Sequence, residues 1–280
     1  MAVKIITDST SDITADLAKK LDVTVIPLTV LFGRQSFLDR VEMTTDEFYR
    51  RLSQESIFPT TTQPTPAAFA DIYGKILASG DDVLAIVISS KLSGTYQSAT
   101  SAIAIAGGEG RVKVIDSLST AMGLGLLVIA AARLAQQGFA LDQISRTIEE
   151  KLPHSHVIML FDTLKYLAKG GRIGKAQGLL GSMLSVKPIL TMKDGVVHPL
   201  TRLRSMAAGT DYLYKFVTDF PKIEALAVEH ATTPHEADAL IARLNAVYPR
   251  EHIYRSTVSP VLGTYMGPNV LSVTVLESKQ

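Results

Sequence analysis

The chain has 280 residues, of which 46% are hydrophobic and 20% charged, a composition typical of one large globular domain or two of ordinary size. Its formal net charge is +1 and it contains no tryptophan, so nothing indicates a basic, aromatic surface and we expect no nucleic-acid partner. It contains no cysteine, which excludes disulfides and thiolate zinc sites and favours a reducing compartment.

The first residues predict a β-strand rather than the apolar region of a signal peptide. The longest uncharged run, between Asp116 and Arg133, is short for a membrane span and ends at an arginine. We therefore expect a cytoplasmic protein with no stable membrane insertion.

The first half of the chain alternates apolar, β-branched runs with helical patterns, which predicts a doubly wound parallel sheet. Pro27 indicates an edge or a bulge in the second run. Thr44 with Glu47 forms a capping-box pattern, and Thr65-Pro66 is typical of a helix start. The expected strands are residues 3–7, 23–31, 83–88 and 112–115, and the first expected helix is residues 14–21.

The pattern changes near Pro153, and the second half predicts an α+β arrangement. Asp194-Gly195 between apolar runs is a strong hairpin signal, and Thr233-Pro234 with Glu236 is typical of a helix start. We predict an N-terminal α/β domain of residues 1–153 and a C-terminal α+β domain of residues 154–280. The expected elements are a strand at 157–160, two helices around a glycine-rich turn, a hairpin at 188–200, a helix from about 204, and strands at 223–229, 252–257 and 270–276.

Hydroxyl-rich loops follow several predicted strands. Ser93-Gly94-Thr95 lies between the strand at 83–88 and a helix, and Ser117 follows the strand at 112–115. A third group, at 60–66, precedes a helix. Open α/β sheets bind ligands at the carboxyl ends of their strands, where helix N-termini favour anions by about 0.3–1 kcal/mol when exposed. Each loop can be interpreted as ordinary helix capping or as part of one anion site.

Several familiar catalytic patterns are absent from the sequence. It has no Gly-x-Ser-x-Gly motif and no histidine pair with metal-ligand spacing, so we expect no metal. Only three residues separate Gly170 from Gly174-Lys175, one too few for a nucleotide-binding P-loop, and Ala176 cannot bind magnesium. Arg172 in this turn is either solvated or available to a partner or a phosphorylated group.

The segment from Asp162 to Lys175, continuing through 179–182 to 187–190, strongly resembles the DegV family. This is a family of bacterial fatty-acid-binding proteins that serve as the acyl-carrying subunit of fatty acid kinase. The resemblance covers the whole chain in order. It also includes Asp8-Ser9-Thr10 and residues 61–64, 92–99 and 114–117.

The resemblance implies that a long-chain fatty acid binds between the two domains, as a ligand rather than a cofactor. It implies that Thr61 and Ser93 hold the carboxylate beside the Gly94 backbone, and that a kinase catalytic subunit phosphorylates it. Arg172 and Arg202 match positions that the family uses to meet the kinase. The chain itself then performs no chemistry. Thr62, Thr95 and Ser117, in the same hydroxyl-rich loops, are further candidate ligand-binding residues.

One departure from the family pattern concerns the head group. The family's Gly-x-His-x-Gly-Pro-Gly ending is here Gly-Thr-Tyr-Met-Gly-Pro-Asn, so that Tyr265 replaces the histidine. A phenol donates a hydrogen bond but does not become cationic near neutral pH. Asn269 in place of glycine is a milder change, because asparagine tolerates positive φ. We include Tyr265 among the candidate ligand-binding residues.

The energetics of a lipid ligand place most of its affinity in the tail. Burial of roughly fourteen methylenes gives about 11 kcal/mol, against association costs of about 4–15 kcal/mol. Neutral hydroxyl hydrogen bonds add only about 0.5–1.5 kcal/mol each. A long apolar tunnel is therefore expected. Its candidate lining is Met122, Leu124, Leu126, Leu127, Ile158, Leu160, Met183, Leu184 and Leu190.

Two other hypotheses remain open at this point. Ser93 would be the nucleophile of a hydrolase or acyl transferase, which requires a general base within reach. Alternatively, the protein is a sensor whose ligand alters docking through Arg172 and Arg202.

Overall fold

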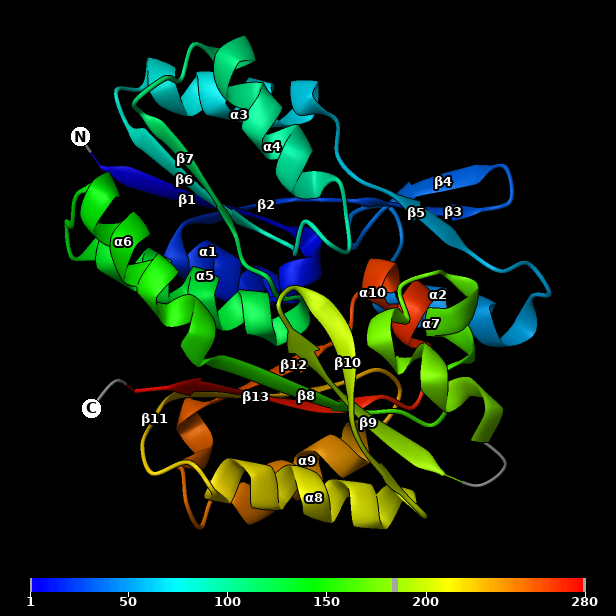
Figure 1. Cartoon of the computed structure of the whole chain (residues 1–280). Coiled ribbons are helices and arrows are strands. Elements are labelled where there is room, and N and C mark those ends of the chain that lie inside the picture. Colours follow the sequence, from blue (N-terminus) through cyan, green and yellow to red (C-terminus); the bar gives the residue numbers. More distant parts are fainter. Residues whose placement is uncertain (1, 183–185, 279–280) are drawn as a thin grey trace.

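A four-stranded parallel sheet forms the N-terminal part of the computed structural model, which describes residues 2–182 and 186–278 (Figure 1). Helices cover both faces of this sheet, so the predicted doubly wound arrangement is confirmed. Its strands, in spatial order, are β2 (Val23–Ile26), β1 (Val3–Asp8), β6 (Asp82–Val87) and β7 (Val112–Asp116). One face carries α3 (Pro66–Ala78) and α4 (Thr95–Ala106), and the other carries α1 (Ala15–Leu21), α5 (Ala121–Gln136) and α6 (Leu141–Lys151).

A six-stranded mixed sheet forms the C-terminal part. Asp194 and Gly195 both have positive φ in the turn between its first two strands, as the hairpin signal predicted. Helices α8 (Met206–Thr218) and α9 (Pro234–Leu244) pack on its outer face (Figure 1). In spatial order its strands are β10 (Val196–Leu203), β9 (Lys187–Lys193), β8 (Ser155–Leu160), β13 (Leu271–Glu277), β11 (Ile223–His230) and β12 (Ile253–Thr257).

Helix α5 lies between the two sheets and contacts strands of both. Its residues from Ala121 to Val128 are all buried, which explains why its sequence is apolar on every side. The two sheets are thus packed against one shared helix rather than joined only by a linker. We propose the domain boundary at residues 153–154, after the last strand of one sheet and before the first strand of the other.

A small antiparallel sheet beside the first one was not predicted. The extended segment 23–31 is in fact two strands in two sheets, because Pro27 has no N–H to continue the ladder of β2. Residues 60–62, expected in a loop, form the edge strand β5. The small sheet contains β4 (Gln35–Leu38), β3 (Thr29–Phe32) and β5 (Thr60–Thr62), and α2 (Thr45–Gln54) follows it in the chain.

The predicted helix starts are right in position but not always in capping chemistry. Thr44 accepts a hydrogen bond from the Glu47 N–H at 3.2 Å, whereas the Glu47 carboxylate pairs with Arg50 instead of completing the box. Thr233 donates to the Val270 carbonyl oxygen rather than capping α9.

Around the glycine-rich turn, α7 (Lys165–Lys169) is an α-helix and Gly174–Ser182 is a 3₁₀ helix. Helix α10 (Pro260–Met266) was not predicted. Other 3₁₀ turns are Ser9–Ser11, Leu152–His154 and Arg250–His252.

Candidate functional site

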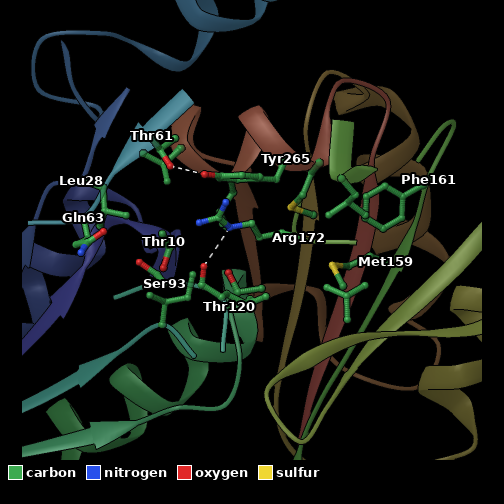
Figure 2. Close-up of a pocket in the computed structure, with 17 residues that line it drawn as sticks. Thr10, Leu28, Thr61, Gln63, Ser93, Thr120, Met159, Phe161, Arg172 and Tyr265 are labelled. Carbon is green, nitrogen blue, oxygen red and sulfur yellow. Dashed lines mark hydrogen bonds between the residues drawn. The ribbon is translucent and has the colours of Figure 1, made fainter. Parts of the chain in front are cut away.

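A cavity lies between the two sheets, beside the carboxyl ends of β1 and β6 (Figure 2). The chain leaves β1 toward β2 on one side, while β6 lies on the other side, so this is the switch point at which open α/β sheets bind ligands. About 70 Å³ of the cavity admits the centre of a water-sized sphere. One water needs roughly 10–15 Å³ by this measure, so the cavity is larger than a packing gap.

One end of the cavity is lined by hydroxyl groups. Alternation along β5 places the half-buried Thr61 opposite to the exposed Thr60 and Thr62. The Thr61 Oγ1 lies 2.6 Å from the Tyr265 hydroxyl, which reaches it from α10 (Figure 2). Ser93, at the start of α4, also lines the cavity, and its Oγ lies 2.8 Å from the Thr95 Oγ1. The structure thus brings Thr61, Ser93 and Tyr265 to one cavity.

Arg172 also lines the cavity, and its side chain lies between Tyr265 and Ser93 in Figure 2, although the residue is exposed overall. Its Nε donates to the Leu92 carbonyl oxygen at 3.3 Å, and its Nη1 donates to the Gly170 carbonyl oxygen at 2.9 Å. The guanidinium carbon is 5.1 Å from the centre of the Tyr265 ring. A Cβ on Gly170 would lie 2.4 Å from that ring, so the glycine is needed for the tyrosine to pack here.

The opposite end of the cavity is apolar, and part of its predicted lining is wrong. Met159 and Phe161 line the cavity from the side of β8, opposite the hydroxyl groups in Figure 2. Ile158 and Leu160 point to the other face of the sheet, toward α8 and α9, because side chains alternate along a strand. Leu124, Leu127 and Leu190 are core residues, Met122 and Leu126 line other surface hollows, and Met183 and Leu184 lie outside the described residues.

Several predicted site residues do not line the cavity. Thr62 is exposed on the far side of β5, and Thr95 is buried beneath Ser93. Ser117 is buried and exchanges hydrogen bonds with the backbone of Ser119. Gly94 is the exposed N-cap of α4, and a Cβ there would lie 2.6 Å from the Gln63 amide nitrogen. Arg202 borders a separate surface hollow next to Leu179 and Leu200.

Three further polar residues of the cavity, Thr10, Gln63 and Thr120, were not named as site residues from the sequence. Gln63 and Thr10 stand in the segments that carry the family resemblance, which was the available signal. Thr10 donates to the Asp8 carboxylate, whose other oxygen accepts the Ile88 N–H at 2.8 Å. Burial raises the pKa of Asp8, and these hydrogen bonds oppose that rise.

A cluster of buried carboxyls lies behind the cavity, around the Arg40 guanidinium. Asp12 accepts from Arg40 at 3.2 Å and from the Ser259 N–H at 3.2 Å, while Asp39 accepts from Ser9 at 2.6 Å. Asp12 faces Glu229 of β11 across the junction of the two sheets. Burial raises the pKa of Asp39 to about 7, and burial together with the nearby Glu229 raises the pKa of Asp12.

Comparisons with known proteins agree with the fold and the chain length. The family model described as "Uncharacterised protein, DegV family" matches residues 2–278. The chain belongs to the DegV family. A DegV domain-containing protein of Caldanaerobacter subterraneus is 36% identical over 97% of both chains.

Solved structures of this family show the same fold. A DegV family protein from Thermus thermophilus, described by its fatty acid binding, has a TM-score of 0.92 and 32% identity over 99% of this chain and 100% of its own. DegV from Bacillus subtilis, described as a fatty acid binding protein, has a TM-score of 0.89 and 29% identity, again over 99% of this chain and 100% of its own. The predicted family and fold class are thus confirmed.

The described residues, 2–182 and 186–278, also bear on metal binding and membrane insertion. No three histidine, aspartate or glutamate side chains among them are arranged to hold a metal ion. None of their helices is both long and apolar enough to cross a membrane.

Proposed function

We propose that this DegV family protein binds a long-chain fatty acid in the cavity between its two sheets. The carboxylate lies at Thr61, Ser93 and Tyr265, and the tail extends toward Met159 and Phe161. The observation that carries this proposal is the polarity of the cavity, with hydroxyl groups at one end and apolar side chains at the other. The fatty acid binding described for the Thermus and Bacillus relatives supports it.

The hydroxyl end suits a carboxylate that is bound but not transformed. Hydrogen bonds to a charged group contribute about 1.5–3 kcal/mol each, more than neutral ones. The Thr61 and Tyr265 hydroxyls already share one hydrogen bond, so only one of their two protons is committed between them. The other proton is available to the ligand. Arg172, an exposed residue that also lines the cavity, adds positive charge beside the hydroxyl groups.

We further propose that the bound carboxylate is presented beside Arg172 to the catalytic subunit of a fatty acid kinase, and that Arg172 and Arg202 contact that subunit. Arg172 supports this because it is exposed while its guanidinium lies against the head-group residues. Arg202 is also exposed, on β10, the strand that supplies Val197 to the cavity. The chain would then act as an acyl carrier in the cytoplasm.

A Ser93-dependent hydrolase has less support. The Ser93 Oγ is hydrogen-bonded to the hydroxyl and N–H of Thr95, and within the described chain no histidine or carboxylate is bonded to it. A serine nucleophile needs such a base.

The proposal is tested by mass spectrometry of lipid extracted from the purified protein and by titration with oleate. Thr61→Ala combined with Ser93→Ala should weaken oleate binding about 100-fold or more, since two hydrogen bonds to a carboxylate are lost. Thr62→Ala, on the exposed face of the same strand, is the matched control and should bind oleate as the unmodified protein does. Unchanged affinity in the double variant would reject the assigned head-group site.

A further inference from the structure

The position of helix α10 depends on two buried acids. The helix supplies four residues to the cavity, Val261, Leu262, Tyr265 and Met266. At its N-terminus, the Ser259 N–H donates to the Asp12 carboxylate at 3.2 Å, and the Val261 N–H faces the Asp39 carboxylate. Displacement of either carboxyl would therefore shift the helix that brings Tyr265 to Thr61.

These acids outnumber the positive charges around them. Asp8, Asp12, Asp39 and Glu229 are buried together, and Arg40 is the cation that faces them among the described residues. The Asp12 Oδ2, Asp39 Oδ1 and Glu229 Oε1 are buried and accept no hydrogen bond from the described chain. When one of two facing carboxyls takes up a proton, its O–H donates a hydrogen bond to the acceptor oxygen of the other.

The other groups that contact the acids or the backbone beside them are a tyrosine, two serines and a backbone N–H. Tyr49 of α2 donates to the Val258 carbonyl oxygen, and its pKa is raised by burial and by the acids. Ser256 of β12 donates to the Asp12 carbonyl oxygen, and Ser272 of β13 donates to Glu229 at 3.1 Å. From α5, the Met122 N–H faces Glu229. His230, next to Glu229, interacts with Arg255 and Asp238 of the C-terminal part instead.

We propose that Asp12, Asp39 and Glu229 are positioning residues that fix α10, and through it Tyr265, according to how many protons they carry. At lower pH a proton shared by Asp12 and Glu229 joins the two sheets, and a protonated Asp39 adds no negative charge beside them, so α10 is held against the cavity. At higher pH ionisation adds negative charge around one guanidinium, the junction loosens, and a bound ligand exchanges faster. The burial that raises the pKa of Asp39 to about 7 places this change near neutral pH.

The first test needs no ligand. Hydrogen–deuterium exchange of the peptide that covers residues 258–267 is measured at pH 6 and pH 8 and corrected for the intrinsic pH dependence of exchange. The corrected rate should be about tenfold higher at pH 8, as expected for the ionisation of a group with a pKa between these values. Asp39→Asn, which cannot ionise, should remove this difference, whereas Asp46→Asn, at an exposed position of α2, should keep it.

A merely structural role of Asp39 would change the exchange rate of this peptide equally at both pH values. A corrected rate that does not depend on pH in the unmodified protein, or a difference that persists in Asp39→Asn, would overturn the proposal.

The second test rests on the proposed function. Transfer of bound oleate to phosphatidylcholine vesicles should be about tenfold faster at pH 8 than at pH 6, and independent of pH in Asp39→Asn. If the protein does not bind oleate, the proposed function fails while the exchange experiment still decides the role of the acids. Oleate transfer that is equally fast at both pH values, with normal oleate affinity, would reject the link from the acids to the ligand.

Discussion

The junction of the two sheets contains two polar regions that differ in charge. The head-group end of the cavity consists of hydroxyls beside one exposed arginine, whereas the cluster behind it contains four buried carboxyls and one partly buried arginine. Neutral hydroxyls cost less to bury than carboxylates do, and the pair formed by Thr61 and Tyr265 still has a proton to donate to a charged ligand. Buried carboxyls are costly unless they are paired or protonated, so their interactions are already committed within the protein.

We expect the two regions to have different roles, which are ligand binding at the hydroxyl end and support of helix α10 by the acid cluster. Helix α10 connects the two regions, since its first turn contacts Asp12 and Asp39 and its last turn carries Tyr265. The hydroxyl end should therefore govern affinity, and the acid cluster should govern stability and the placement of the helix.

The first prediction concerns Arg40→Met, which removes the cation from the acid cluster. It should lower the free energy of unfolding by about 3–5 kcal/mol at pH 8, because buried carboxylates are left without compensation. The loss should be smaller at pH 5, where the carboxyls take up protons. Urea denaturation at both pH values measures it.

Arg50→Met is the control for this experiment. Arg50 forms an exposed ion pair with Glu47 on α2, which is typically worth less than about 1 kcal/mol. If Arg40→Met and Arg50→Met lower the free energy of unfolding equally, the acid cluster does not depend on Arg40.

The second prediction concerns the apolar end of the cavity. Met159→Trp should shorten the space for the tail, and each excluded methylene costs about 0.8 kcal/mol, or about fourfold in affinity. Affinity for oleate should fall about 50-fold if three methylenes are excluded, while affinity for the shorter laurate changes little. If the affinities for oleate and laurate fall by the same factor, the tail does not extend toward Met159.

The third prediction concerns the sign of the pH dependence of stability. Burial raises the pKa of Asp12 in the folded protein, so its contribution to stability is present at low pH and is lost as the pH rises. In Asp12→Asn the amide oxygen still accepts from Ser259 and Arg40, and the amide N–H₂ takes the place of the proton shared with Glu229. The melting temperature of this variant, relative to the unmodified protein, should therefore rise from pH 5 to pH 8. A relative melting temperature that falls over this range would contradict the shared proton.

These two regions were not equally predictable from the sequence. The parallel sheet and the Asp194-Gly195 hairpin follow from local patterns, and Ser93 follows from its place after a buried strand. The acid cluster was missed because Asp12 and Glu229 are 217 residues apart, and neither segment has a periodicity that indicates their contact. Strand β5 was missed because three threonines between loops carry no apolar alternation. The predicted lining residues Ile158 and Leu160 were wrong because residues 157–160 are all apolar, and such a run does not reveal which face of a strand meets a cavity.

The fourth and smallest effect is expected at Tyr265, where the hydroxyl end meets helix α10. Tyr265→Phe keeps the ring beneath Arg172 and against Gly170 but removes the hydroxyl that lies 2.6 Å from Thr61. Loss of one hydrogen bond of about 0.5–1.5 kcal/mol should weaken oleate binding roughly 2- to 12-fold, with the melting temperature nearly unchanged.

Tyr265→His separates the effect of charge from that of the hydrogen bond. A histidine is shorter than tyrosine but becomes cationic as the pH falls, so the oleate affinity of Tyr265→His should rise from pH 8 to pH 6 relative to Tyr265→Phe. If both variants bind oleate as the unmodified protein does at every pH, Tyr265 only packs against Arg172, and the carboxylate is held by Thr61 and Ser93 alone.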